Sequence, residues 1–311
     1  MSHISTPGPP AWSWDEYEHW LWPEWQKCLR DNASDEAPVH HFLEQNPCLL
    51  PGGEASAASI GGHHGPFPGA VISKPLLPGT FSRQPDFMWP TKMSSVFMPV
   101  LLEIERPEKR WFTAKGQQTA TLTQAMNQVA EWRTWLNSEA NKLVFYEKYG
   151  ISSWIRSYFQ VQPVFGLVYG RRAEFAADAR LSVHRESIRP EWLHWSTYDG
   201  LAPSADARRR ICVRVKEGAG WEVVAIPPTF EFSDHAEDDL QGIVGLDRAI
   251  IENPLLSGPR KQYLLDQLSR ITIKQAASPN LWELDLHLFL EGHGQYEPQW
   301  EPPDAQAPSG C

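Results

Sequence analysis

The strongest constraint on the fold is an apolar run that ends abruptly in acidic residues. Residues 96–102 read Val-Phe-Met-Pro-Val-Leu-Leu, and Glu103-Ile104-Glu105 follow directly. A short run of this kind is typical of a strand that is buried on both faces. An unpaired carboxylate is costly to bury. Acids at the point where such a strand emerges therefore indicate a candidate functional site.

The residues before that run predict the first strand of a β-hairpin. We expect strands over residues 81–89 and 96–105, joined by a turn over residues 90–95. If the turn is centred on its last two residues, Asp86 lies directly across the hairpin from Glu103. The sequence thus predicts that two acids far apart in the chain become neighbours.

The acidic side chains of this hairpin are expected to converge. Side chains alternate along a strand, so Glu103 and Glu105 point the same way. With Asp86 they bring like charges together, which is destabilising unless a cation neutralises them. Oxygen ligands suit Mg²⁺ or Mn²⁺, and such an ion polarises a phosphate and activates water. In a simpler interpretation the acids are solvated and Glu105 pairs with Arg106.

The remaining pattern predicts an α/β protein. We expect helices over residues 14–29, 37–47, 119–137 and 175–187, and further strands over 161–169 and 192–197. Residues 37–202 then form a small mixed sheet flanked by helices. Residues 1–36 are expected to be a tryptophan-rich helical segment with a disordered start. Residues 203–311 are expected to form an α+β module with a hairpin over 211–225 and helices over 240–251, 258–278 and 280–291.

Composition excludes several classes of function. The 311 residues carry a net charge of −10, so a basic coat for nucleic acid is absent overall, although a local basic stripe is compatible with this balance. No apolar run reaches the ~20 residues that a membrane helix needs. The first residues lack a secretory signal pattern, and the four cysteines form no C-x-x-C pair. We expect a cytoplasmic protein without a membrane partner.

Other common site motifs are missing or incomplete. The pairs His40-His41 and His63-His64 have no third partner at a spacing typical of zinc ligands. The glycine-rich residues 61–69 lack the Lys-Ser/Thr of a phosphate loop, and no Gly-x-Ser-x-Gly is present. Zinc, ATP and acyl-transfer chemistry therefore have no support.

Six segments occur in the order typical of a nuclease family. They are Phe42-Leu43-Glu44-Gln45-Asn46-Pro47, Gln84-Pro85-Asp86-Phe87, Leu102 to Pro107, Gln124 to Gln128 with Trp132, Val164 to Arg171, and Ser196 to Leu201. An acid and then Glu-x-Lys on adjacent strands, followed by a helix that carries glutamine, resembles the PD-(D/E)xK nuclease superfamily. The series is more similar still to one branch, the Shedu anti-phage defence family. The resemblance covers about residues 37–202 and implies a restriction-endonuclease-like core.

The resemblance implies roles for individual residues. Asp86 and Glu103 would be the metal ligands, Glu44 the acid on the first helix and Gln128 the polar group on the helix beside the site. One departure stands out, because the lysine of the family pattern falls at Glu105. Some restriction endonucleases of the superfamily carry glutamate there and still cleave. Glu105 is then expected to take a proton from water or to hold a second metal ion.

The loop after the acids is basic and ends in an aromatic residue. Arg106, Lys109 and Arg110, with Lys115 beyond them, are expected to contact DNA phosphates, and Trp111 to stack on a base. A loop that is merely solvated fits the same residues equally well. Any of these four basic residues is also a candidate for the cation that position 105 does not supply.

The function expected from this pattern is metal-dependent hydrolysis of DNA, with phage or plasmid DNA as the partner. The resemblance also implies assembly into a homo-oligomer. An alternative is a nuclease-fold module that has lost catalysis and acts in nucleic-acid binding or assembly. A weaker alternative is a glycosidase with a carboxylate pair, which would work without metal.

Overall fold

The computed structural model describes residues 8–51, 60, 69–78, 84–176, 178–216, 220–232 and 243–271. Within these ranges a nine-stranded mixed sheet has the order β6-β5-β3-β2-β1-β7-β8-β9, with β4 beside β3. The strands are β1 (Ala70–Ser73), β2 (Phe87–Met93), β3 (Val96–Ile104), β4 (Gln160–Val161), β5 (Val164–Val168), β6 (Leu193–Ser196), β7 (Ile211–Lys216), β8 (Gly220–Ala225) and β9 (Ile243–Val244). The α/β class is confirmed, and the sheet is larger than the small one expected.

The predicted hairpin is present, with the predicted register. β2 and β3 pair antiparallel from Met93 opposite Val96 to Phe87 opposite Leu102. The turn lies at Ser94 and the residue after it, and Ser94 adopts a left-handed φ of 48°. Asp86 directly precedes Phe87, whose partner is Leu102. It therefore lies opposite Glu103, the residue that follows Leu102.

The boundaries of the first strand of the hairpin differ from those expected. β2 begins at Phe87 and continues through Pro90 to Met93, so the expected turn over residues 90–95 shrinks to its last two residues. Pro90 lies opposite Pro99. Because proline has no backbone N–H, neither strand has a donor without an acceptor at this pair. Of the expected strand residues, 81–83 lie outside the described residues.

Most strands of the sheet run in one direction. β3, β5 and β6 are parallel, and β1 is antiparallel to β2 and parallel to β7, so β1, β3, β5, β6 and β7 share a carboxyl edge. The amino end of β2 meets the same edge. Ligands of such sheets commonly bind outside the carboxyl ends of the strands.

The sheet continues across the expected boundary at residue 202. Ala70, Val71 and Ile72 of β1 pair with Ile211, Cys212 and Val213 of β7, and the predicted hairpin β7–β8 extends the sheet from there. Residues beyond 202 thus contribute to the same sheet as the hairpin that carries the acids.

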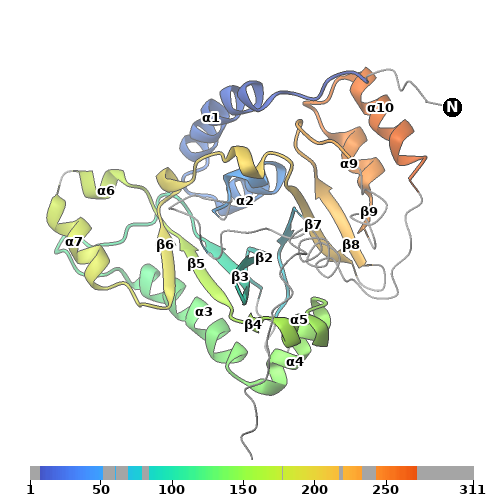
Figure 1. Ribbon diagram of the computed structural model, residues 1–311. Helices are drawn as coiled ribbons and strands as arrows, with labels where there is room; N and C mark the ends of the chain where they lie inside the picture. Colours follow the sequence, from blue (N-terminus) through green and yellow to red (C-terminus); the bar gives the residue numbers. More distant parts are fainter. Residues whose placement is uncertain are drawn as a thin grey trace, which may run out of the picture.

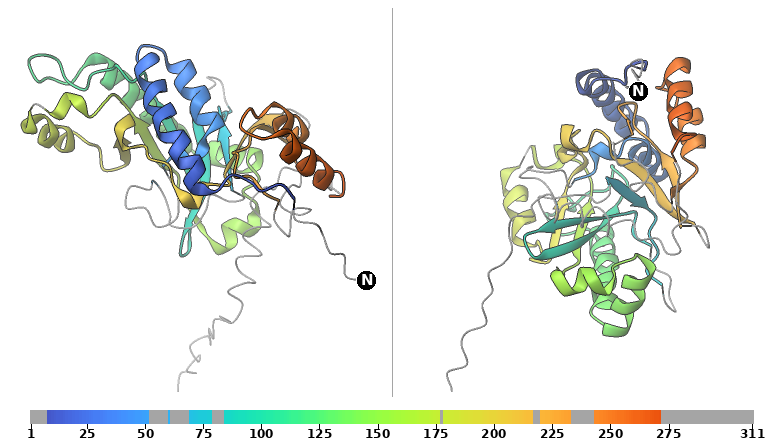
Figure 2. Two further views of the ribbon diagram at one scale, coloured as in Figure 1. Left: turned by 90° about the horizontal axis from the view of Figure 1, so that it is seen from above. Right: turned by 45° about the vertical axis from the view of Figure 1, so that its right-hand side comes forward.

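Helices cover both faces of the sheet (Figure 1). They are α1 (Trp14–Asp31), α2 (Glu36–Gln45), α3 (Ala120–Leu136), α4 (Glu139–Lys148), α5 (Ser153–Tyr158), α6 (Ala173–Ala176), α7 (Ala179–Ser187), α9 (Leu246–Glu252) and α10 (Gly258–Leu268). Figure 2 shows α1 and α2 together on one side of the sheet. The single helix expected over 175–187 is two short helices, and the residues of the helix expected over 280–291 lie outside the described ranges.

Alternation along β3 divides the core into two layers. Val100, Leu102 and Ile104 pack with buried residues of α1 and α2, such as Trp25 and Leu43. Leu101 belongs to the opposite layer, together with the predicted stripe of α3: Leu122, Ala125, Val129, Trp132 and Leu136. A side chain at an odd position of β3 therefore faces α3. Position 103 is such a position.

Local signals explain where the helices that flank the site begin. Thr119 accepts a hydrogen bond from the backbone N–H of Leu122 at the start of α3, and Asp35 accepts one from Ala37 at the start of α2. Asn46-Pro47 ends α2, as predicted. In the described ranges no helix is both long and apolar enough to cross a membrane.

Candidate active site at the carboxyl edge of the sheet

Asp86 and Glu103 lie side by side at the end of the hairpin. The backbone N–H of Asp86 donates to the carbonyl of Leu102 at 3.0 Å, and Asp86 Oδ2 accepts the N–H of Ile104 at 2.8 Å. Both carboxylates are buried. The second contact fixes the orientation of the Asp86 side chain across the strand pair, so the predicted convergence of these two acids is present.

Glu103 is held by a glutamine of α3. Glu103 is 7% exposed, and Gln128 Nε2 donates a hydrogen bond to Glu103 Oε1. Its other oxygen, Oε2, is buried and has no hydrogen-bond partner within the described residues. Burial raises the pKa of Glu103 well above its ordinary value, and the carboxylates of Asp86 and Glu105 raise it further. An unsatisfied buried oxygen of this kind is expensive unless a proton or a cation occupies it.

Lys74 brings a positive charge to Asp86. It directly follows β1, and its Nζ atom pairs with Asp86 Oδ1. Its backbone N–H donates to the carbonyl of Asp86 at 2.8 Å, and its φ of 49° is left-handed. Burial alone would lower the pKa of Lys74, but Asp86, with Glu103 and Glu36, outweighs it and the pKa is raised. Sequence reasoning missed this lysine, because the pairing of β1 with β2 cannot be read from a motif.

Glu105 lies just beyond β3 and pairs with a second lysine. Lys109 Nζ contacts Glu105 Oε2. The backbone around Glu105 is fixed, since its N–H donates to Val168 O at 3.0 Å and the buried Tyr198 hydroxyl donates to its carbonyl at 2.5 Å. Of the basic residues expected to replace the family lysine, Lys109 is thus placed at the acids. Tyr198 was not expected to contribute.

Glu36 joins the acidic group from the first turn of α2. Burial raises its pKa to about 7, and the Asp86 and Glu105 carboxylates raise it as well, while Lys74 and Lys109 act in the opposite direction. In the sequence this residue looks like an ordinary acid that complements the helix dipole. Its position beside three other acids was therefore not predictable from spacing.

Glu44 is linked to Asp86 through a histidine, His40. Ser73 Oγ donates to Glu44 Oε1 at 2.5 Å, and Arg214 of β7 contacts the same oxygen at 3.0 Å. His40 Nδ1 lies 3.8 Å from Glu44 Oε1, and its Nε2 lies 3.8 Å from Asp86 Oδ1. Glu44 therefore supports the acidic group indirectly, through His40.

His40 is buried between these acids. Its ring stacks on Phe87 with the centroids 4.5 Å apart. Burial lowers the pKa of His40, although the Asp86 carboxylate opposes this shift. The neutral ring is then the favoured form. The adjacent His41 lies at the surface, and its Nδ1 atom is 3.4 Å from the other oxygen of Glu44.

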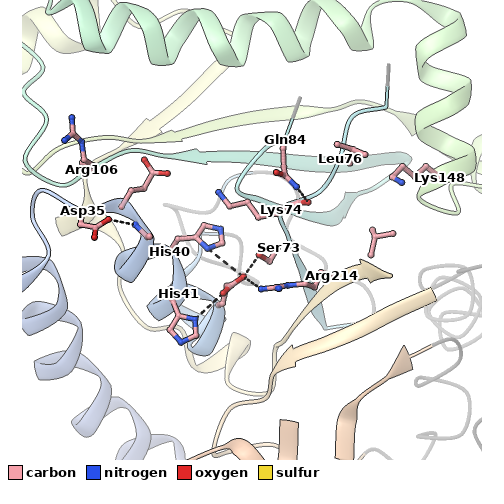
Figure 3. Close-up of a pocket in the computed structure, with 14 residues that line it drawn as sticks. Asp35, His40, His41, Ser73, Lys74, Leu76, Gln84, Arg106, Lys148 and Arg214 are labelled. Atoms are coloured by element: carbon pink, nitrogen blue, oxygen red, sulfur yellow. Dashed lines mark hydrogen bonds and ion pairs between the residues drawn. The ribbon is translucent and has the colours of Figure 1, made fainter. Parts of the chain in front are cut away.

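A cleft of about 780 Å³ opens beside this group (Figure 3). Basic side chains reach it from separate elements: Lys74 after β1, Arg106 after β3, Lys148 at the end of α4, and Arg214 in β7. In Figure 3 they lie around a floor that holds His40 and Ser73. Glu36 and Glu44 also line the cleft, and the basic side chains around them are suited to attract a phosphate.

The other residues expected to contact DNA are less uniform. Arg106 is 3.7 Å from Glu108, Arg110 is 3.9 Å from Glu174, and Lys115 is exposed on a turn. The expected stacking of Trp111 on a base is wrong, because the ring is 0% exposed and its N–H donates to Tyr169 O at 3.0 Å.

Asp199 links two segments at this edge of the sheet. Its carboxylate accepts from Arg171 at 2.6 Å and from the backbone N–H of Arg172 at 2.5 Å. It therefore joins the segments that follow β5 and β6. This contact holds the carboxyl edge together next to Tyr198.

The acids meet part of the requirement for a metal ion. Across the described ranges, no set of three or more His, Cys, Asp or Glu side chains is already arranged to hold one. Both oxygens of Asp86 are engaged, one with Lys74 and one with Ile104. The unpartnered Glu103 Oε2 and the crowding of carboxylates nevertheless fit a hard cation, which would take the place of the Lys74 ammonium at Asp86.

A family model matches part of this chain. The family model described as "Shedu protein SduA, C-terminal" matches residues 33–202, which is more than half of the chain. Among curated proteins, none matches. The matched region contains all of the residues at the acidic group, whereas Arg214 lies outside it.

Proposed function

The chain belongs to the Shedu SduA C-terminal family, and from this premise we propose that it is a metal-dependent nuclease that hydrolyses phosphodiester bonds of DNA in anti-phage defence. The observation that carries the proposal is the register of β2 and β3. It places Asp86 opposite Glu103, whose buried Oε2 atom has no hydrogen-bond partner among the described residues. A restriction-endonuclease-like core of the PD-(D/E)xK type is part of the same proposal.

In this proposal Asp86 and Glu103 would hold Mg²⁺ or Mn²⁺, which when bound would supply a Lewis acid at the scissile phosphate. Gln128 keeps Glu103 in place through its Oε1 atom. Glu105 accepts a proton from the attacking water as the new bond to phosphorus forms and the bond to the leaving oxygen breaks. The contact with Lys109 Nζ holds the Glu105 carboxylate in place.

Lys74 has two positions in this scheme. In the free protein its ammonium neutralises Asp86. When a metal ion takes that carboxylate, the flexible lysine stem allows Nζ to turn to a phosphate oxygen. Lys74 then supplies the charge that a lysine at position 105 supplies in the family pattern.

The overall acidity of the chain limits how it holds DNA. A net charge of −10 opposes non-specific binding, so phosphate contacts must be local. The basic rim of the cleft, with Lys109, Arg110 and Lys115 beyond it, supplies them. We expect weak binding by a monomer and stronger binding by a homo-oligomer that aligns several rims.

Plasmid cleavage tests the proposal. Wild-type protein is incubated with supercoiled plasmid and Mg²⁺ or Mn²⁺ beside Asp86→Asn. The matched control is Glu139→Gln, an exposed acid of α4 that pairs with Lys142. We expect nicking by the wild type and the control but not by Asp86→Asn, and none in the presence of a chelator. Equal nicking by all three proteins would indicate contamination and contradict the proposal.

One observation favours the alternative of a binding module without catalysis. Lys74 and Lys109 already neutralise Asp86 and Glu105, so much of the acidic group is balanced without metal. Binding of DNA that is unchanged by Mg²⁺ and by Asp86→Asn, together with no nicking under any metal, is the result that supports this alternative.

A further inference from the structure

A second hollow lies along α3. It has a volume of about 600 Å³, and its polar lining includes Gln84, Thr123, Gln124, Asn127, Gln128 and Glu131. The α3 members recur at helical spacing on a stripe beside the buried one, which contains Val129 and Trp132. This amide groove, as we call it, was not part of the site expected from the sequence.

The amide groove and the cleft share a lining residue, Gln84. Gln84 lines both hollows and donates from Nε2 to Lys74 O at 2.9 Å. In Figure 3 it lies at the edge of the basic cleft, toward the helix across the top of the view. Gln128 lines the groove and holds Glu103. The two hollows are thus linked through Gln84, and the groove is linked to the acids through Gln128.

The two hollows differ in charge. Lys74, Arg106, Lys148 and Arg214 line the cleft, whereas no lysine or arginine is among the described residues that line the amide groove. A phosphate is attracted to the first and gains nothing in the second, where Glu131 repels it. A neutral group that carries both donors and acceptors suits the amides.

Two amides of the groove are free to bind a ligand. Gln124 and Asn127 are exposed, and neither side chain has a hydrogen-bond partner within the described part of the chain. They lie three residues apart on one helix, so they face the same way. Asparagine and glutamine amides match the polar edges of bases, adenine above all, with one donor and one acceptor.

From this geometry we infer that the amide groove binds a nucleobase next to the bond that is cleaved, while the cleft holds the phosphates. This inference rests on the proposed nuclease function and adds to it a site of base contact. The position of a base along the DNA strand then affects binding. A base on one side of the scissile phosphate touches Gln124 and Asn127, and bases on the other side do not.

Binding without cleavage tests the inference. Fluorescent single-stranded and duplex oligonucleotides are titrated in a chelator with the wild type and with the double variant Gln124→Ala/Asn127→Ala. The matched control is Gln160→Ala/Gln162→Ala, which removes two exposed amides at the opposite end of β3 and β5. An abasic position is moved along each oligonucleotide, and affinity is measured at several salt concentrations.

We expect the wild type to lose about 10-fold in affinity at one abasic position. The double variant should bind the intact oligonucleotide about 10-fold more weakly and should no longer respond to that abasic position. Its salt dependence and that of the control should equal the wild type, because no phosphate contact is lost. The two types of oligonucleotide show whether the base must be unpaired.

Three results would overturn the inference. One is an abasic profile that is the same for the wild type and the double variant. Another is a reduced salt dependence in the double variant, which indicates phosphate contacts. The third is an equal loss in the control. If the wild type nicks plasmid but shows any of these results, base binding in the groove fails and the nuclease proposal stands. Absence of both binding and nicking contradicts the nuclease proposal itself.

Discussion

Lys74 and Asp86 form an ion pair between the end of β1 and the start of β2, and the backbone N–H of the same lysine donates to the carbonyl of Asp86 at 2.8 Å. The lysine holds this position with a left-handed φ of 49°, a conformation that favours glycine. Strain at such a position typically costs about 1–3 kcal/mol and is found mostly at functional sites. The pair therefore combines backbone strain with a charge contact.

Comparison of Lys74→Gly with Lys74→Ala separates these two contributions. Both variants lose the ammonium, so we expect plasmid nicking to fall at least 10-fold in each. Glycine also relieves the left-handed backbone, so Lys74→Gly should be about 1 kcal/mol more stable than Lys74→Ala in urea unfolding. If Lys74→Ala nicks like the wild type, the lysine has no part in the reaction.

Glu36 makes the stability of the free protein depend on pH. Its pKa in the folded state is about 7, above the ordinary value of 4.5. Folding therefore favours the protonated form, and the stability that this provides is present below about pH 4.5 and is lost as the pH rises through about 7. We expect Glu36→Gln to be about 1 kcal/mol more stable than the wild type at pH 8, after allowance for partial exposure to solvent.

The two proteins should differ little near pH 4.5, where Glu36 is protonated in the folded state and half protonated in the unfolded state. Urea unfolding at pH 4.5, 6, 7 and 8 measures the difference. A gap of constant size at every pH would mean that packing, rather than ionisation, explains it. Glu139→Gln is the matched control, because Glu139 is exposed and lies outside the site.

The sequence was sufficient for the part of the site that one hairpin determines. An apolar run and a short turn fix the register of β2 and β3, so the contact between Asp86 and Glu103 was predictable. Gln128 and Glu44 followed from the resemblance alone. The lysine at Asp86 was not predictable, because it depends on the pairing of β1 with β2.

Contacts between distant segments account for the other differences. Trp111 is adjacent to basic residues in the sequence, but Trp195 and Phe175 pack around its ring with centroids 4.9 and 5.9 Å away. A motif cannot show whether an aromatic side chain in a loop turns inward. Likewise, Arg214 reaches Glu44 only because β7 joins the sheet beside β1. From the sequence, we expected that strand to belong to a separate module over residues 203–311.

Tyr198 offers a test of how the loop after β3 is held. Its hydroxyl donates to Glu105 O at 2.5 Å, and the ring is fully buried. Tyr198→Phe keeps the ring but leaves that carbonyl without this donor, at a cost of about 1–2 kcal/mol. We expect a lower melting temperature and a several-fold lower rate of nicking, with unchanged affinity for DNA. A loss of affinity equal to the loss of rate would place Tyr198 in binding instead.

Glu103 gives the sharpest test for a metal ion. Because burial and the neighbouring carboxylates disfavour its charge, Glu103→Gln should be more stable than the wild type at pH 8 in a chelator. Adding Mn²⁺ should reverse the order. A ligand at 100 times its Kd stabilises the folded state by about 2.7 kcal/mol, and the variant lacks the carboxylate that binds it. Thermal unfolding with and without Mn²⁺ measures both effects, and equal shifts in the two proteins would mean that Glu103 binds no metal.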